Sequence, residues 1–536
     1  MFIEDLRNDF YNVLLGNRVL LLVHYDVDAI CACKILQGLF KCDNISYTLV
    51  PVGGVSELKT AYEENNEEIK FVVLVNCGGT IDLVDILQPE EDVVFFVLDS
   101  HKPTDICNVY SDGQVRLVYK DTEENIPNFD DIFRDDEEEE QEPQGSGMEA
   151  LEAAVEKRRE RRAWEERRHT LMFNYTQFSY YGKPSACVAL DLAWLVSRCG
   201  GAALWAAAVG AASHEALHAR PPAQALLDAA SLHRLVAGGQ HAAGDTNVSG
   251  CVVLEKDVWL PLYRSWSVEA ALRHAPATGP YLKLHTLAGA ARLRQLLADM
   301  GFPLQQARQA YRSMDVELRR CLLSALEAAA PKHELPPPTR AAFVLQRPHA
   351  PPRPAHDLAY ALLGLIEHVT LPIARHFKLI NSSWVTGGHR DTGPAGLQAA
   401  QRALEAVARL VHATLSARRL HLAGPFGYFI VQEGTPEARF VRGPHWLGVA
   451  ARWASSACGG ARPLLASAPL DDATCLLVGI PPRFDQEPRN LFGAAFEQAA
   501  RKSGASVSLD LLDASVITLP TSQRPQFLDA LTALLA

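Results

Sequence analysis

The sequence predicts an α/β protein of more than one domain, with a mainly parallel sheet at its N-terminus. The chain has 536 residues, which is too many for a single hydrophobic core. Its first part contains four apolar, β-prone runs separated by helical stretches, at residues 19–23, 45–52, 71–75 and 93–98. Runs that are apolar on both faces are typical of parallel strands covered by helices on both sides.

A helical middle section and a second α/β unit are expected after this sheet. Ala- and Leu-rich tracts at residues 185–239 and 281–330 have helical spacing, and proline-rich stretches between residues 336 and 354 predict a connector. Near the C-terminus we expect helices at 397–417, 490–502 and 525–535, and strands at 427–431, 439–441, 474–480 and 515–519. We therefore predict domains at 1–225, 226–375 and 395–536, the second of them all helical, with the limits between 334 and 396 left open.

Two charged segments interrupt the first domain. Residues 121–147 contain an acidic run at 135–140 and few large apolar side chains, so we expect a disordered loop. Residues 148–173 follow with Glu-to-Arg spacings of three and four, which favour a long exposed helix. A solvated helix is the commoner meaning of such a pattern, and a nuclear-import signal or a partner-docking arm is the alternative.

Composition and charge exclude several classes of protein. The net charge of −12 argues against a surface devoted wholly to nucleic acid, but it leaves room for a local basic groove. No apolar run reaches the length of about 20 residues that spans a bilayer, and the N-terminus does not resemble a signal peptide. The eleven cysteines lack zinc-site spacing, so we expect free thiols in an intracellular protein. The absence of a phosphate-binding P-loop motif predicts no ATP hydrolysis.

Acidic and imidazole side chains follow two of the predicted strands. Asp26 and Asp28 come directly after the first strand, and Asp99 and His101 follow the fourth. Because ligands gather at the carboxyl ends of parallel strands, these oxygens and nitrogens could hold Mn²⁺ or Mg²⁺. Asp28 could instead serve only as a helix cap, and each pair alone is weak evidence.

These motifs resemble those of the DHH phosphoesterases, whose RecJ-type members read Asp-x-Asp-x-Asp-Gly, a strand-end Asp, Asp-His-His and a further Asp. In that resemblance Asp26 and Asp28 match the last two carboxylates of the first motif, and Asp99 and His101 match the ends of Asp-His-His. The departures are His24, Ala29, Asn76 and Ser100, with Gly210-Ala211-Ala212-Ser213-His214 near the expected last Asp.

The lost ligands predict a vestigial site. Each missing carboxylate removes a negative charge that would oppose a pair of divalent ions, at a cost well above an ordinary hydrogen bond of about 1 kcal/mol. We therefore expect no catalytic residues, no cofactor and no metal pair, with Asp26, Asp28, Asp99 and His101 as the vestigial candidates; a single weakly held ion stays open. Gly387-Gly388-His389 is similar to the phosphate-gripping motif of RecJ, although chance loop composition is the favoured interpretation.

A second resemblance, to the cell-division-cycle protein 45 family, extends over most of the chain. It rests on segments at residues 24–36, 47–52, 131–135, 297–304 and 478–482, together with the acidic loop and the Arg-rich helix. The resemblance implies a DHH-like domain, an inserted helical domain and a C-terminal domain akin to the one that follows DHH domains. It also implies a nuclear protein needed for initiation and elongation of DNA replication.

The implied partners are the minichromosome maintenance ring, the GINS complex, replication initiation factors and single-stranded DNA. On this basis the chain is expected to be a non-catalytic subunit of the eukaryotic replicative helicase. The alternatives are an active Mn²⁺-dependent nuclease or phosphoesterase that uses the four strand-end residues, and a regulatory nuclear scaffold away from forks.

Overall fold

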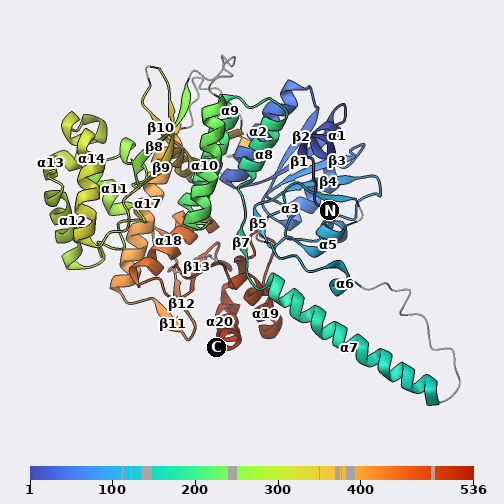
Figure 1. The fold of residues 1–536 in the computed structure, drawn as a ribbon. Helices are drawn as coiled ribbons and strands as arrows, with labels where there is room; N and C mark the ends of the chain where they lie inside the picture. The colour runs from blue at the N-terminus through green and yellow to red at the C-terminus, as the bar shows by residue number, and fades with distance from the viewer. Residues whose placement is uncertain are drawn as a thin grey trace.

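A computed structural model describes residues 1–111, 113–121, 124–133, 148–239, 250–348, 350–368, 375, 377–378, 380–381, 393–483 and 489–536. It places an N-terminal sheet domain at one side, a helical layer in the middle and a C-terminal sheet below (Figure 1). None of the described helices combines the length and the apolar character needed to cross a membrane.

The predicted parallel N-terminal sheet is confirmed. Its order is β2-β1-β3-β4-β6, and every neighbouring pair is parallel. The strands are β1 (Val19–His24), β2 (Tyr47–Val52), β3 (Phe71–Val75), β4 (Val94–Leu98) and β6 (Val115–Leu117). Strand β6 was not predicted, because it is three residues long and has Arg116 at its centre.

Helices cover both faces of this sheet, as its two-sided apolar strands require. One face packs against α2 (Val27–Cys42), α8 (Ser185–Leu195) and α9 (Gly201–Ala216). The other face packs against α3 (Val55–Asn65), α4 (Leu83–Leu87) and α5 (Ile106–Tyr110). The candidate site forms at the carboxyl ends of the strands, beside the first turns of α2 and α8.

The Arg- and Glu-rich helix is confirmed as α7 (Met148–Thr176), which projects away from the body of the molecule (Figure 1). Its base is fixed by Tyr175, whose hydroxyl donates to the carbonyl of Thr104 at 2.7 Å and to Glu124 at 2.8 Å. Trp164 donates to the carbonyl of Asp130, so the short helix α6 (Phe129–Ile132) supports the arm. The arm therefore leaves the body in a defined direction.

The expectation of disorder over residues 121–147 is wrong for part of that range. Residues 124–133 are ordered, because Glu124 is buried and pairs with Lys102 at 2.9 Å. A buried ion pair fixes the chain locally in a way that composition does not reveal. The remaining acidic run, 134–147, lies outside the described residues.

The expectation that residues 226–375 are all helical is also wrong. A three-stranded antiparallel sheet of order β10-β9-β8 joins β8 (Cys251–Val258), β9 (Thr339–Gln346) and β10 (Arg353–Pro354). Some eighty residues of mostly helical chain separate β8 from β9. Prolines flank β9, and for this reason the sequence suggested a connector there. The helices of this region are α10 (Pro222–Gly239), α11 (Val268–His274), α12 (Leu287–Asp299), α13 (Leu304–Arg308), α14 (Val316–Ala329) and α15 (Ala355–Ile366).

The C-terminal α/β unit is confirmed, as a mixed sheet of order β11-β12-β13-β14-β15. The strands are β11 (His421–Ala423), β12 (Phe426–Ile430), β13 (Leu464–Pro469), β14 (Thr474–Ile480) and β15 (Val516–Pro520). The helices around them are α17 (Gly393–Ser416), α18 (Pro444–Ala457), α19 (Phe492–Ser503) and α20 (Arg524–Leu535). The strand expected at 439–441 is wrong: Ala438–Phe440 form a 3-10 turn.

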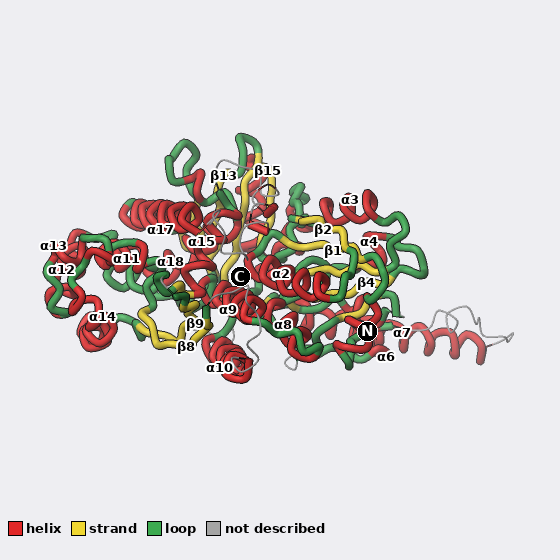
Figure 2. Tube along the Cα trace, turned by 90° about the horizontal axis from the view of Figure 1, so that it is seen from above, coloured by secondary structure: helices red, strands yellow, loops and turns green. Residues whose placement is uncertain are grey.

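One continuous hydrophobic core joins the two sheets through the helical layer. It extends from Phe10 in the first domain, through α9, α15 and α17, to Val516 in the C-terminal sheet. Helices α11 to α14 have a separate small core and lie at the far end of the molecule (Figure 2). The carboxyl ends of the N-terminal strands thus face the C-terminal sheet across a shared cavity.

Two half-buried histidines, one on α11 and one on α17, predict acid sensitivity. Burial, with the charge of Arg273, lowers the pKa of His274 to about 4, and burial, with His285, lowers the pKa of His412 to about 4. Unfolded histidine binds a proton near pH 6.5, so below that pH the unfolded chain holds more protons than the folded one.

We expect the contribution of these two histidines to the free energy of unfolding to be constant above about pH 6.5 and to fall between about pH 6.5 and pH 4. The slope should be at most about 1.4 kcal/mol per pH unit for each histidine. Urea unfolding at a series of pH values measures it, and His274→Gln should flatten the slope. In the protein without the substitution, a free energy of unfolding that stays constant down to pH 4 would contradict the prediction.

Candidate functional site

The strand-end residues meet in one cavity of about 140 Å³. The four predicted residues, Asp26, Asp28, Asp99 and His101, come together at the carboxyl ends of β1 and β4, and three of them line the cavity directly. The C-terminal sheet closes the opposite side. The other polar residues that line the cavity include His24, Asn76, Ser100, Tyr181, Ser213, His214, His445, Arg452, Asn490, Asp513 and Ser515.

Asp28 is buried and its oxygens are already used by the protein. They accept hydrogen bonds from the backbone N–H groups of Ser185, at 2.7 Å, and Ala186, at 3.0 Å, in the first turn of α8. His214 Nε2 lies 3.4 Å from the same carboxylate. A negative charge at a helix N-terminus is well stabilised without a metal, so Asp28 fixes α8 against α2.

Asn76 occupies the centre of the group. Its amide nitrogen donates to Asp26 at 3.0 Å and to Asp28 at 3.2 Å. Its amide oxygen accepts from the Ser185 hydroxyl at 2.5 Å and from the Ser100 backbone at 3.2 Å. The side-chain NH₂ group therefore lies between the two carboxylates, in the position that suits a cation. Asn76 also has a left-handed backbone (φ 52°), which asparagine tolerates better than most residues.

Asp99 and His101 form a buried pair beside this group. His101 Nδ1 lies 2.8 Å from Asp99 Oδ1, and Asp99 Oδ2 accepts from the backbone N–H of Gly79 at 2.8 Å. Burial lowers the pKa of His101, but Asp99, with Asp513 and Asp26, outweighs burial and raises the pKa to about 9. His101 is then protonated at neutral pH, so a metal ion would have to displace this proton in order to bind the imidazole.

Asp26 has a similar histidine partner. His24 Nδ1 lies 3.0 Å from Asp26 Oδ2, and Asp26 Oδ1 caps α2 through the backbone N–H of Ala29. Burial raises the pKa of Asp26, but the hydrogen bond and charge of His24 outweigh it, so the pKa lies below the usual value. The carboxylates are thus hydrogen-bonded by histidine and amide groups of the chain itself.

The donor set fits a pair of divalent ions poorly. In a two-metal site the two ions lie about 4 Å apart and are held by free carboxylate oxygens. Here Asp26, Asp28 and Asp99 are each hydrogen-bonded to protein donors, and an amide stands where the second motif needs a carboxylate. Gly387-Gly388-His389, the other phosphate-binding candidate, lies outside the described residues.

Sequence reasoning missed the residues that complete the cavity. Asp513 comes from the C-terminal domain and accepts from the Tyr181 hydroxyl at 2.9 Å, while His101 packs against the Tyr181 ring. His214, noted only as lying near the expected last carboxylate, is buried beside Asp28. No short motif surrounds Asp513 or Tyr181, and only the packing of the two domains brings them to the strand ends.

The sequence model of the CDC45 family matches residues 19–160, 120–376 and 390–534. The chain belongs to the CDC45 family. It is 37% identical to the mouse cell division control protein 45 homolog and 36% identical to the human one, in both cases over 100% of each chain. The crystal structure of CDC45 from Entamoeba histolytica shares its fold, with a TM-score of 0.74 over 100% of both chains at 18% identity. Membership makes the chain a CDC45-type replication factor.

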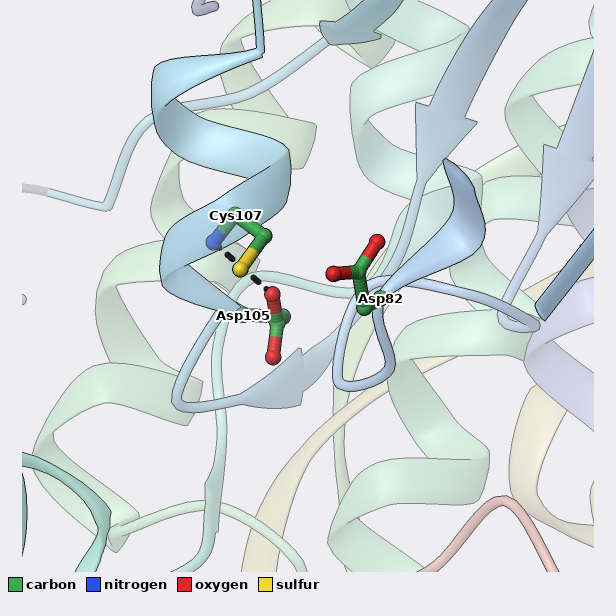
Figure 3. A group of neighbouring side chains, drawn as sticks. All are labelled: Asp82, Asp105 and Cys107. Carbon is green, nitrogen blue, oxygen red and sulfur yellow. Dashed lines mark hydrogen bonds between the residues drawn. The ribbon is translucent and has the colours of Figure 1, made fainter. Parts of the chain in front are cut away.

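A second group of possible metal ligands lies elsewhere in this CDC45-family chain. Among the described residues, ligand atoms of Asp82, Asp105 and Cys107 lie within 4.8 Å of one another (Figure 3). Each carboxylate begins a helix: Asp82 caps α4 and Asp105 caps α5 by accepting the backbone N–H of Cys107. Capping explains both aspartates. Burial raises the pKa of Cys107 to about 12, so the thiol is a poor ligand.

Gly79 lets the loop after β3 approach the loop after β4 closely in the strand-end site. A Cβ atom on Gly79 would lie 2.8 Å from Asp99 Cβ and 2.9 Å from Asp99 Oδ2. We expect Gly79→Ala to displace the Asp99 loop and lower the free energy of unfolding by about 1–3 kcal/mol in urea titrations.

Gly38→Ala is the matched control. Gly38 lies on the exposed side of α2 with no atom within 4 Å of the added carbon. Alanine there should raise stability by about 0.5–1 kcal/mol, because glycine disfavours helix. Equal losses for both variants would mean that the close approach at Asp99 is unimportant.

Proposed function

We propose that this CDC45-family chain is a non-catalytic subunit of the eukaryotic replicative helicase. In this role it acts in the nucleus during initiation and elongation of DNA replication and joins the minichromosome maintenance ring to the GINS complex. The observation that carries the non-catalytic part is the amide of Asn76, which donates to both Asp26 and Asp28 where a phosphoesterase would hold a cation. Family membership supports the replication part.

The α7 arm is the proposed docking element for the motor ring. It carries exposed arginines over several turns and is held at its base by Tyr175, so it presents charge at a fixed distance from the body (Figure 1). The arm also carries glutamates, but its basic residues cluster at 157–162. This cluster suits an acidic patch on a partner, because complementary charge steers association.

The arm is tested by replacing Arg158, Arg159, Arg161 and Arg162 with alanine, which keeps helix propensity. We expect capture of the ring and GINS in a pull-down to weaken roughly tenfold or more, equivalent to about 1.4 kcal/mol, with the unfolding temperature unchanged. The control replaces two exposed arginines on α12, Arg292 and Arg294. Unchanged capture by the α7 variant, or an equal loss of capture in the control, would show that the arm is not part of the interface.

Binding to single-stranded DNA is the second part of the proposal. The net charge of −12 means that any such contact uses a local basic surface, and its affinity should fall as salt rises because phosphate contacts release counterions. Fluorescence anisotropy with a labelled oligonucleotide at increasing salt measures this. A salt-independent affinity would contradict strand binding through phosphates.

A further inference from the structure

A second and larger cavity, of about 560 Å³, lies beside the strand-end site. Three parts of the chain form it: the junction of α9 and α10, the ends of β8 and β9, and the C-terminal domain at α18 and the end of β14. Its volume is typical of small-molecule sites, which often lie where domains meet. None of the four vestigial candidates, Asp26, Asp28, Asp99 and His101, lines this second cavity.

The cavity wall is strongly basic. Arg220, Arg340, Arg452 and Arg483 line it, and Glu215 is the one carboxylate among its described lining residues. Glu215 is already engaged by His356 at 2.6 Å and lies 3.5 Å from Arg340. Arg220 pairs with Asp228, outside the cavity. Arg452 and Arg483 therefore contribute positive charge that no described acidic side chain of the lining balances.

A buried donor at the wall lacks a hydrogen bond. Arg340 is 10% exposed; its buried Nε atom makes no hydrogen bond among the described residues, and its Nη1 atom has only the 3.5 Å contact with Glu215. Buried guanidinium donors are normally satisfied, so an unsatisfied one at a cavity wall indicates a missing acceptor.

The rest of the wall is flat and apolar. Trp259 is half-buried, with Arg340 lying 5.6 Å from its ring centroid and His218 packed against it. Prolines form much of the remaining surface: Pro221, Pro222, Pro276, Pro336, Pro337, Pro481 and Pro482. A simple inorganic anion would leave this surface unused, whereas a ligand with both a phosphate and a ring system would use both parts.

We propose that this cavity binds a nucleoside phosphate, with the phosphate held by Arg340, Arg452 and Arg483 and the base packed against Trp259. Arginine forks match phosphate oxygens, and bases stack on aromatic side chains regardless of sequence. The chemistry is the same for a free nucleotide and for one nucleotide of a single strand. Binding of a free nucleotide goes beyond the proposed helicase role, whereas binding of a strand rests on its single-stranded DNA part. Both are independent of ring and GINS capture.

Calorimetric titration of the full chain tests the site, with dTMP, inorganic phosphate and decathymidylate as probes. We expect saturable binding of dTMP, with phosphate alone at least tenfold weaker. Arg483→Gln should weaken dTMP binding about tenfold, since Arg483 is exposed enough to be replaced without harm to the core. Trp259→Leu should remove the advantage of dTMP over phosphate. The control Arg501→Gln, on α19, should leave binding unchanged.

The three probes also separate the sources of the ligand. If decathymidylate displaces dTMP and loses affinity in the Arg483→Gln protein, the cavity receives a strand; if it does not compete, the ligand is a free nucleotide. The proposal is overturned if dTMP does not bind, if phosphate binds as tightly, if the two variants bind dTMP normally, or if an acidic peptide binds more tightly and displaces it. Intact capture of the ring and GINS alongside any of these would leave the helicase role standing.

Discussion

Replacing Asn76 with aspartate is expected to destabilise the chain strongly in the presence of a chelator. The new carboxylate would face Asp26 and Asp28, which now accept hydrogen bonds from the Asn76 amide. An uncompensated buried charge costs about 3–5 kcal/mol. Aspartate has nearly the same shape and tolerates the left-handed backbone at this position, so the effect reports charge rather than strain.

Mn²⁺ should recover part of that loss, because the variant regains one carboxylate of the ancestral pattern. Chemical unfolding with EDTA and with excess Mn²⁺ measures both effects. The matched control is Asn490→Asp, a buried amide that bonds to the Gly479 carbonyl and the Phe492 backbone and to no carboxylate. Asn490 lines the same cavity but contacts no carboxylate, so its variant should lose stability and should be rescued by Mn²⁺ less than Asn76→Asp. A harmless Asn76→Asp change in EDTA would show that the amide does not hold the carboxylates together.

Replacing Lys102 with methionine is expected to have an effect of similar size. Lys102 is 4% exposed and its partner Glu124 is 1% exposed, with 2.9 Å between Nζ and Oε2. Removal of one member of a buried ion pair leaves the other charge unpaired and costs about 3–5 kcal/mol. Glu124 also accepts from Tyr175 at the base of α7, so the arm should loosen as the domain weakens.

The double variant Lys102→Met/Glu124→Gln separates charge from packing. Glutamine keeps an acceptor for the Thr104 N–H and the Tyr175 hydroxyl but carries no charge. The double variant should therefore regain most of the stability that Lys102→Met loses, a non-additivity expected of residues in direct contact. Additive losses in urea titrations would contradict the ion-pair interpretation.

The sequence was most informative where a pattern is local. The four apolar runs predicted the parallel sheet because strands buried on both faces need no partner information to be recognised. It was least informative where pairing is long-range: β8 and β9 pair across the whole outer helical region, and prolines beside β9 hid the strand. Glu124 lies in an acidic stretch, and only its distant partner Lys102 makes it part of the core.

The sequence predicted one wall of the candidate site and not the other. Parallel topology placed Asp26, Asp28, Asp99 and His101 at one edge, because carboxyl ends of parallel strands meet there. The closing wall, with Asp513, comes from a domain more than four hundred residues away in the sequence, and no local pattern marks it. The role of Asn76 was foreseen as a lost ligand, but its donation to two carboxylates required the geometry.

The central claim is that the strand-end site cannot hold a pair of divalent ions. Manganese binding by the unmodified chain tests this claim most directly. Isothermal titration with Mn²⁺, together with a cleavage assay on labelled single-stranded DNA, measures occupancy and activity on one sample. The account predicts fewer than two ions bound per chain at neutral pH and no cleavage above background. Two tightly bound ions, with cleavage that disappears in Asp99→Ala, would contradict it and establish an active phosphoesterase.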